Sequence, residues 1–366
     1  PGSMWALSRF DDVVNAFLDP DTFSSGGVDE LVQPRWMSED CKLNPNLISV
    51  DPPIHREYRH LVNKAFLMKV IASLEPRMTE LAETLLAEFP RAKEHDFVEG
   101  FAIPYAGGVI TRLVGLDGTQ PPDEVKEWLG LVEMSSPQDP RPEFKHALET
   151  AIRRQFSYFD AVIEQRRKTP RNDLISSLLS QELEGKRLPN ALIRNFLYLF
   201  VAAGYHTSYH FLSKAIIHLS QDQILFRRLK QNPELVPAFV EELLRFDPPA
   251  HGILRRTTVD VTLHNTTIPK GALVVLLLAA ANRDPRMFSQ PDEFILNRDL
   301  AKKHVGFGYG IHLCIGAMLA RKEMCVALTC FLKRVDSFSC PPLDHLNWTR
   351  SFMMRGIVDL PLVLSQ

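Results

Sequence analysis

The sequence predicts a mainly α-helical fold with small β-sheets, an α+β class, and three observations lead to this expectation. Apolar residues recur at three- and four-residue spacing over four long segments, 78–89, 148–167, 192–219 and 236–246. Short β-like stretches lie between turn residues at 258–263, 266–271 and 273–278. Prolines, which cannot continue a helix, stand between the segments at Pro52, Pro53, Pro121, Pro122, Pro248 and Pro249.

Length and charge limit the domain organisation and the partners. The chain has 366 residues, 45% of them hydrophobic, so it can bury a large core, and we expect one domain over residues 5–366. Residues 1–4 look like a protease scar followed by an initiator methionine and are left out of the fold. The balance of 42 basic against 44 acidic residues gives no reason to expect nucleic acid or an anionic membrane as a partner.

Hydrophobic runs and cysteines indicate the compartment. The longest apolar runs, 196–205 and 272–281, are about half as long as the roughly 20 residues that a membrane-spanning helix needs. Five cysteines are an odd number without the dense spacing of a disulfide scaffold, which predicts a reducing compartment. We therefore expect a cytoplasmic, monomeric protein that binds a small molecule.

The segment 192–219 predicts an unusually long helix. A helix of this length reaches about 40 Å, the width of a whole domain, so it must cross the core. Its middle, 202–208, reads Ala-Ala-Gly-Tyr-His-Thr-Ser, which is small and polar where a packing helix carries leucine. Small residues leave room for a ligand against this helix.

The strongest motif is residues 307–316, Phe-Gly-Tyr-Gly-Ile-His-Leu-Cys-Ile-Gly, which place Cys314 just before a predicted helix at 317–330. Glycines allow positive φ and close approach to a flat cofactor, and the N–H groups of the following helix favour a thiolate. Cys314 is therefore a candidate metal ligand. The remaining cysteines are interpreted as small buried hydrophobic residues: Cys41, Cys325, Cys330 and Cys340.

These ten residues resemble the haem-binding signature of the cytochrome P-450 superfamily, and weaker matches extend over about residues 5–362. The resemblance implies a cytochrome P-450 fold with the long central helix over haem b. It also implies that Cys314 is the axial iron ligand and that Phe307, Gly308, Ala203 and Gly204 contact the cofactor. The implied activity is that of a monooxygenase, in which thiolate donation favours cleavage of the O–O bond of O2.

Residues 51–59, Asp-Pro-Pro-Ile-His-Arg-Glu-Tyr-Arg, resemble the family segment that opens a helix on one face of the haem. His55 and Arg59 are four residues apart and therefore share one helix face. The resemblance implies that they bind a haem propionate together with Arg255 and His312. Buried carboxylates need fixed donors, and the arginine fork meets that need.

Glu242 and Arg245, three residues apart, can pair on one helix face. By resemblance they belong to a buried charge cluster that Arg298 completes. Because buried charges are costly unless they are paired, we interpret this cluster as specifying the fold rather than as catalytic.

The chain departs from the family pattern in two places. Family members usually begin with several dozen more residues, so we expect part of the channel wall and of the sheet edge to be missing or replaced. In the long helix, His206 stands where the family has an acid that relays protons with the following alcohol, whereas Thr207 and Ser208 keep their hydroxyls. His206 relays protons with a changed pH dependence, positions a carboxylate or hydroxyl of the substrate, or is a core histidine bonded to a backbone carbonyl. A metal pair with His210 lacks a third ligand motif.

The resemblance implies a small-molecule substrate, O2, and electrons from a separate ferredoxin and ferredoxin reductase, since we expect no fused reductase. The candidate pocket residues are all apolar and predict a bulky, largely apolar natural product of secondary metabolism: Phe200, Ala203, Ile253, Phe352 and Met353. Two alternatives stay open. The chain is a peroxide-driven peroxygenase or oxidative coupling enzyme, or it is a haem-binding scaffold without catalysis.

Overall fold

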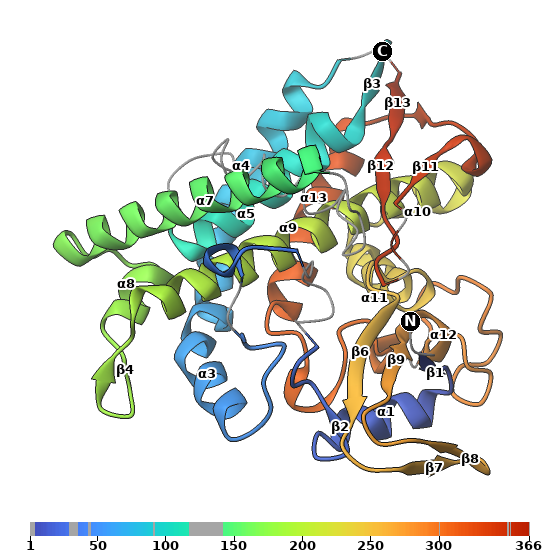
Figure 1. The fold of residues 1–366 in the computed structure, drawn as a ribbon. Helices are drawn as coiled ribbons and strands as arrows, with labels where there is room; N and C mark the ends of the chain where they lie inside the picture. Colours follow the sequence, from blue (N-terminus) through green and yellow to red (C-terminus); the bar gives the residue numbers. More distant parts are fainter. Residues whose placement is uncertain are drawn as a thin grey trace.

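The computed structural model describes residues 4–28, 36–42, 45–90, 92–116, 142–299, 301–349, 351 and 353–365. Helices make up most of these residues, and the strands form small sheets, which confirms the predicted fold class. Figure 1 shows the helices as the larger body, with β1, β2, β6 and β9 gathered beside α1 at one end. No helix in the described part of the chain is both long and apolar enough to span a bilayer.

The longer helices follow the predicted segments closely. The helix α11 (Val236–Phe246) has the predicted bounds, and α9 (Asn190–Gln221) and α7 (Pro142–Lys168) extend a few residues beyond theirs. The helix α4 (Met68–Glu88) begins before the predicted segment and contains Pro76. The other helices are α1 (Phe10–Leu18), α3 (Ile54–Asn63), α5 (Ile103–Val114), α8 (Leu174–Leu179), α10 (Gln223–Gln231), α12 (Leu278–Ala281) and α13 (Ala317–Arg334), with a one-turn 3-10 helix η6 (Gly310–His312).

The largest sheet has the strand order β1-β9-β6-β2. Its members are β1 (Trp5–Leu7), β2 (Phe23–Ser24), β6 (Gly252–Thr257) and β9 (Leu273–Leu277). The strand β9 lies parallel to β1 and antiparallel to β6. Smaller sheets join β10 (Phe338–Ser339) to β13 (Pro361–Leu364) and β3 (Glu94–Asp96), and pair β4 (Glu182–Leu183) with β5 (Lys186–Arg187), β7 (Val261–Leu263) with β8 (Thr266–Ile268), and β11 (Asn347–Trp348) with β12 (Ile357–Asp359).

The helix α9 crosses the core, as its length predicts. It runs through the middle of the molecule in Figure 1, and it packs against α5, α7 and α13. Its side chains Phe196, Leu197 and Ile216 are fully buried. A Cβ added at Gly204 would lie 2.7 Å from the side chain of Ile110, so glycine is needed where α5 and α9 approach most closely. This crossing places residues 202–208 at the centre of the molecule.

Candidate active site

The loop before α13 holds Cys314 through backbone contacts. The Cys314 N–H donates to the Phe307 carbonyl oxygen at 2.9 Å, which closes the loop on itself. Gly308 and Gly310 have φ of 72° and 65°, and a Cβ at Gly310 would lie 2.7 Å from the carbonyl oxygen of Phe17. Only glycine fits this crossing of the loop over α1. The local fold thus presents Cys314 just ahead of the first turn of α13.

Cys314 differs from the other four cysteines in its exposure. Cys314 is exposed, whereas Cys41 and Cys330 are buried and Cys325 and Cys340 are partly buried. Although the side chain is accessible, desolvation by the surrounding loop raises the pKa of the Cys314 thiol, while the backbone of Gly316 and the charges of Arg59 and Arg321 act in the opposite direction. An iron ion would deprotonate such a thiol outright, so this donor fits a metal-bound thiolate.

The predicted propionate residues converge from three elements: His55 and Arg59 from α3, Arg255 from β6, and His312 from η6. The rings of His55 and His312 lie 4.2 Å apart. Within the described residues, the buried Nε2 of His55 has no hydrogen-bond partner, and no carboxylate forms an ion pair with Arg59 or Arg255. The arrangement therefore presents more donors than the described protein residues use.

Electrostatics identify the kind of group that this cluster accepts. Burial, together with the charges of the neighbouring Arg255, His55 and Arg59, lowers the pKa of His312 to about 3. Burial also lowers the pKa of Arg255 to about 10, against the opposing charge of Asp51. A pair of carboxylates would relieve both the repulsion and the unpaired donor of His55. The residues present therefore fit the two propionates of a haem.

Ser25 is a further contact of this cluster that the sequence reasoning missed. Its Oγ lies 3.1 Å from Nε2 of His312, and its backbone N–H donates to Oδ1 of Asp51 at 2.9 Å. Ser25 is fully buried. It therefore orients the His312 ring from the side of the loop after β2.

In the middle of α9, Thr207 and Ala203 lie together. The Thr207 hydroxyl donates to the Ala203 carbonyl oxygen at 2.7 Å, and Ala203 itself is exposed. His206 is buried beside the rings of Tyr205 and Tyr209, whose centroids lie 5.3 and 6.0 Å away. The helix thus turns Ala203 and Thr207 toward open space and His206 into the protein.

Two predicted residues of α9 have packing contacts that the sequence reasoning did not include. Gly204 faces Ile110 of α5, so its small size serves helix packing. Phe200 is only 4% exposed and packs its ring against Phe66 at 5.1 Å and Phe196 at 6.2 Å. It belongs to the core rather than to the exposed face with Ala203, because its aromatic ring finds apolar partners there.

Ser208 leads to a buried acid that the sequence reasoning also missed. Its hydroxyl donates to Oε1 of Glu323 on α13, and the Tyr105 hydroxyl donates to the Glu323 carbonyl oxygen at 3.0 Å. Burial raises the pKa of Glu323 to about 8, although the hydrogen bond from Ser208 acts in the opposite direction. A protonatable carboxyl group, that of Glu323, is therefore hydrogen-bonded to Ser208, the residue that follows Thr207 in α9.

This shifted pKa predicts a pH dependence of stability. Folded Glu323 keeps its proton up to about pH 8, whereas the unfolded chain releases it near 4.5, so the contribution to stability is lost as pH rises through this window. Glu323→Gln does not titrate, so urea unfolding at about pH 5 and about pH 9 should show a smaller loss of stability for this variant. The exposed control Glu80→Gln should lose as much as the wild type. Equal losses in all three proteins would contradict a buried neutral acid.

The remaining pocket candidates lie on two neighbouring segments. Ile253 is half-buried on β6, on the same strand face as Arg255 two residues later. The carbonyl oxygen of Met353 accepts N–H hydrogen bonds from His251 at 2.7 Å and Gly252 at 3.2 Å, so Met353 lies against the start of β6. Phe352 lies outside the described residues.

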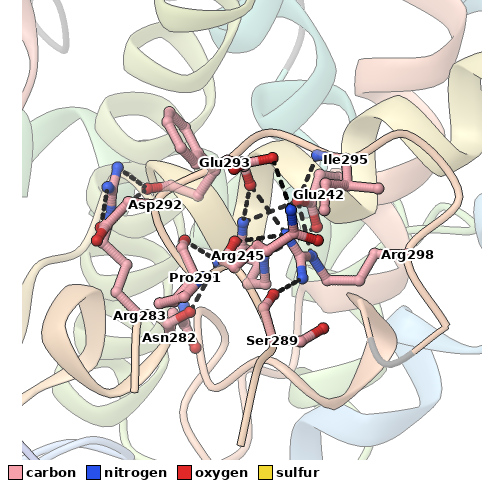
Figure 2. A network of polar contacts seen from close by, with 12 residues as sticks. Glu242, Arg245, Asn282, Arg283, Ser289, Pro291, Asp292, Glu293, Ile295 and Arg298 are labelled. Atoms are coloured by element: carbon pink, nitrogen blue, oxygen red, sulfur yellow. Dashed lines mark hydrogen bonds and ion pairs between the residues drawn. The ribbon is translucent and has the colours of Figure 1, made fainter. Parts of the chain in front are cut away.

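The predicted charge cluster comes together in the core next to the loop that precedes the Cys314 motif (Figure 2). Glu242 and Arg245 are fully buried and pair at 2.8 Å, and Arg298 reaches the same carboxylate at 3.0 Å. The Ile295 N–H also donates to Glu242, at 2.9 Å. The two guanidinium groups donate further to backbone oxygens of Asn282, Ser289, Gln290, Pro291 and Glu293. Every charged group of the cluster is thus hydrogen-bonded, with one carboxylate and several carbonyl oxygens around two guanidinium groups, and none of these bonds involves Cys314.

Comparison with known proteins gives one consistent result. The family described as Cytochrome P450 matches residues 138–355, more than half of the chain. Cytochrome P450 107B1 of Saccharopolyspora erythraea is 32% identical over 367 residues, with 98% of this chain and 88% of that protein covered. The polyketide biosynthesis cytochrome P450 PksS of Bacillus subtilis is 30% identical over 369 residues, with 99% and 89% covered.

Solved structures agree with this assignment. The cytochrome P450 CYP109Q5 from Chondromyces apiculatus superimposes with a TM-score of 0.88 at 33% identity, and 98% of this chain and 89% of that chain are covered. Family, sequence and structure comparisons therefore match the chemistry of the Cys314 loop and the cation cluster. The chain belongs to the cytochrome P450 family of haem-thiolate monooxygenases.

Proposed function

We propose that the protein hydroxylates or epoxidises a largely apolar small molecule of secondary metabolism, with electrons from a separate ferredoxin and ferredoxin reductase. The observation that carries the proposal is the convergence of His55, Arg59, Arg255 and His312 beside the Cys314 loop, since this set fits a haem and its propionates. The relative PksS, named for polyketide biosynthesis, supports a natural-product substrate.

The residues of this chain divide the work between binding and proton handling. Bound haem b supplies the oxidising chemistry that activates O2. Cys314 would hold the iron as a thiolate, and His55, Arg59, Arg255 and His312 would hold the propionates. The Thr207 hydroxyl donates its proton to the Ala203 carbonyl oxygen, so its own oxygen is left to accept a hydrogen bond, and it lies next in the chain to Ser208 of the Ser208–Glu323 pair. Ala203, Ile253 and Met353 form the apolar surface that positions one substrate carbon.

The first test is the absorbance difference spectrum of the dithionite-reduced protein with and without carbon monoxide. A band at about 450 nm is expected for an intact haem-thiolate site. A band at about 420 nm would mean that the thiolate is lost or protonated. Absence of any haem band would overturn the proposal.

His206 gives a second test, of proton delivery. We expect His206→Glu, which restores the acid of the family pattern, to raise the fraction of electrons that end in product by about two-fold or more. His206→Gln cannot relay a proton and should lower that fraction. Coupling is measured as product formed per NAD(P)H consumed, with the band near 450 nm as a check on the site.

The coupling measurement also distinguishes the three interpretations of His206. His218→Gln alters a half-buried histidine of α9, which packs on Phe294 eleven residues beyond Thr207, and should leave coupling unchanged. Unchanged coupling in both His206 variants would mean that His206 is a core histidine rather than part of the relay. A selective loss of substrate binding would mean that it positions the substrate.

A peroxide-driven peroxygenase is the second candidate, and the replacement of the family acid by His206 favours it. Such an enzyme needs no reductase, because hydrogen peroxide supplies both the oxygen atom and the electrons. Turnover with hydrogen peroxide alone, at a rate above that with ferredoxin and reductase, would select this candidate.

A further inference from the structure

A buried lysine on α9, Lys214, lies about two turns beyond Thr207. Its side chain is 1% exposed, and its Nζ donates to Oδ1 of Asp247 at 2.8 Å and to the Pro248 carbonyl oxygen at 2.9 Å. Burial lowers the pKa of Lys214, and the charge of Asp247 opposes this effect. Burial alone would raise the pKa of Asp247, yet the nearby His251, the hydrogen-bonded Lys214 and the charge of Arg355 hold it at about 2. The two groups therefore form an ion pair between α9 and the end of α11.

A second polar contact lies one turn closer to Thr207. Nδ1 of the buried His210 accepts the backbone N–H of Ile357 at 3.2 Å. A Cβ added at Gly356 would lie 2.1 Å from the His210 ring, so the backbone can come this close only at glycine. The C-terminal segment is thereby held directly against α9.

The two held segments, residues 248–254 and 353–357, also bind each other, and we call them the two-segment wall. The His251 N–H donates to the Met353 carbonyl oxygen at 2.7 Å, and the Arg355 N–H donates to the Pro249 carbonyl oxygen at 3.0 Å. Ala250 and Met354 form a β-bridge between the same segments. A displacement of one segment must therefore move the other.

The wall carries the pocket candidates Ile253 and Met353, and its strand β6 continues to Arg255 of the cation cluster. The helix α9 carries Thr207, which the proposed function assigns to the same substrate pocket. Lys214 thus joins the element that presents the relay hydroxyl to the element that presents the apolar surface. A buried ion pair adds little net stability over apolar residues of the same size, so its directional donors act mainly on geometry.

We propose that Lys214 is a positioning residue that sets where the two-segment wall lies relative to Thr207, and so determines which ligands and which substrate carbon the pocket accepts. This inference rests on the proposed function, because it assigns Ile253 and Met353 to the pocket. The hydrogen bonds of Lys214 go to Asp247 and Pro248 and not to the Cys314 loop or the cation cluster, so we expect haem binding itself not to depend on it.

The test compares two iron-binding probes on the holoenzyme by absorbance titration, imidazole and 4-phenylimidazole. Both bind through the same nitrogen, but the phenyl ring reaches the pocket wall, whereas imidazole alone does not. In Lys214→Met we expect 4-phenylimidazole to bind about ten-fold more weakly, which corresponds to about 1.4 kcal/mol. Imidazole affinity should change less than about two-fold, and the carbon monoxide band should stay near 450 nm. Equal changes for both probes, or none, would overturn the proposal.

Two further variants keep the result interpretable. Lys230→Met removes a lysine with the same pattern of contacts, one carboxylate (Asp336, 2.6 Å) and one carbonyl (Val335, 2.7 Å), far along the chain from the wall, and should leave both affinities unchanged. If Lys214→Met does not fold, Lys214→Met with Asp247→Asn removes both charges and should still weaken 4-phenylimidazole selectively. Absence of the carbon monoxide band in the wild type would instead contradict the proposed function, so failure of that function and failure of the Lys214 proposal give different results.

Discussion

Cys314→Ser is expected to abolish the carbon monoxide band near 450 nm and to lower monooxygenase turnover by about a thousand-fold or more, equivalent to about 4 kcal/mol of transition-state stabilisation. The thiolate is the donor that favours cleavage of the O–O bond, and a serine hydroxyl stays protonated at neutral pH and donates far less. The loop should keep its fold, because Cys314 is held through its backbone N–H and the glycines at 308 and 310 are unchanged. Circular dichroism and thermal unfolding would check that the protein folds.

Cys325→Ser is the matched control for this experiment. Cys325 is partly buried on α13, and burial raises the pKa of its thiol to about 11, so it is an inert thiol rather than a ligand. Its replacement should leave both the band and turnover unchanged. If Cys314→Ser kept the band while Cys325→Ser lost it, the assignment of the ligand would be wrong.

The sequence predicts the fold best where periodicity and helix stops agree. The bounds of α11 were correct because its apolar repeat ends just before Asp247 and Pro248. The start of α4 was wrong, since the predicted segment began only at Met78, whereas the helix begins at Met68 and contains Pro76. The strand β6 was missed because Arg255 and Arg256 interrupt its apolar pattern, and Arg255 is buried only when it joins the cation cluster.

The site residues also differ in how well the sequence predicts them. Motif residues whose role depends on neighbours in the chain, such as Cys314 between its glycines, are predictable from sequence. Ser25 and Glu323 were missed, because their partners His312 and Ser208 lie 287 and 115 residues away. The sequence also carries no sign that Gly204 packs against Ile110 on another helix. Tertiary contacts of this kind leave no local pattern.

The second large effect is expected for Glu242→Gln, which should destabilise the protein by about 3–5 kcal/mol. Glu242 is fully buried, and its carboxylate compensates Arg245 and Arg298 and accepts the Ile295 N–H. The amide carries no charge and offers one acceptor oxygen, so two buried guanidinium groups would keep only carbonyl partners. A loss of this size is a large part of the roughly 5–15 kcal/mol that stabilises a typical domain. Urea unfolding, or soluble yield where the variant does not fold, measures it.

Asp292→Asn is the control that separates this burial effect from a general loss of acids in the same region. Asp292 pairs with Arg283 at 2.9 Å beside the cluster, as Figure 2 shows, but its side chain is 80% exposed. Solvent already screens this pair, so the substitution should cost about 1 kcal/mol or less. Comparable losses in both variants would mean that the buried position of Glu242 contributes nothing special. A much larger loss for Glu242→Gln, with the spectrum of the surviving folded fraction unchanged, would show that the cluster supports the fold around Cys314 without taking part in its chemistry.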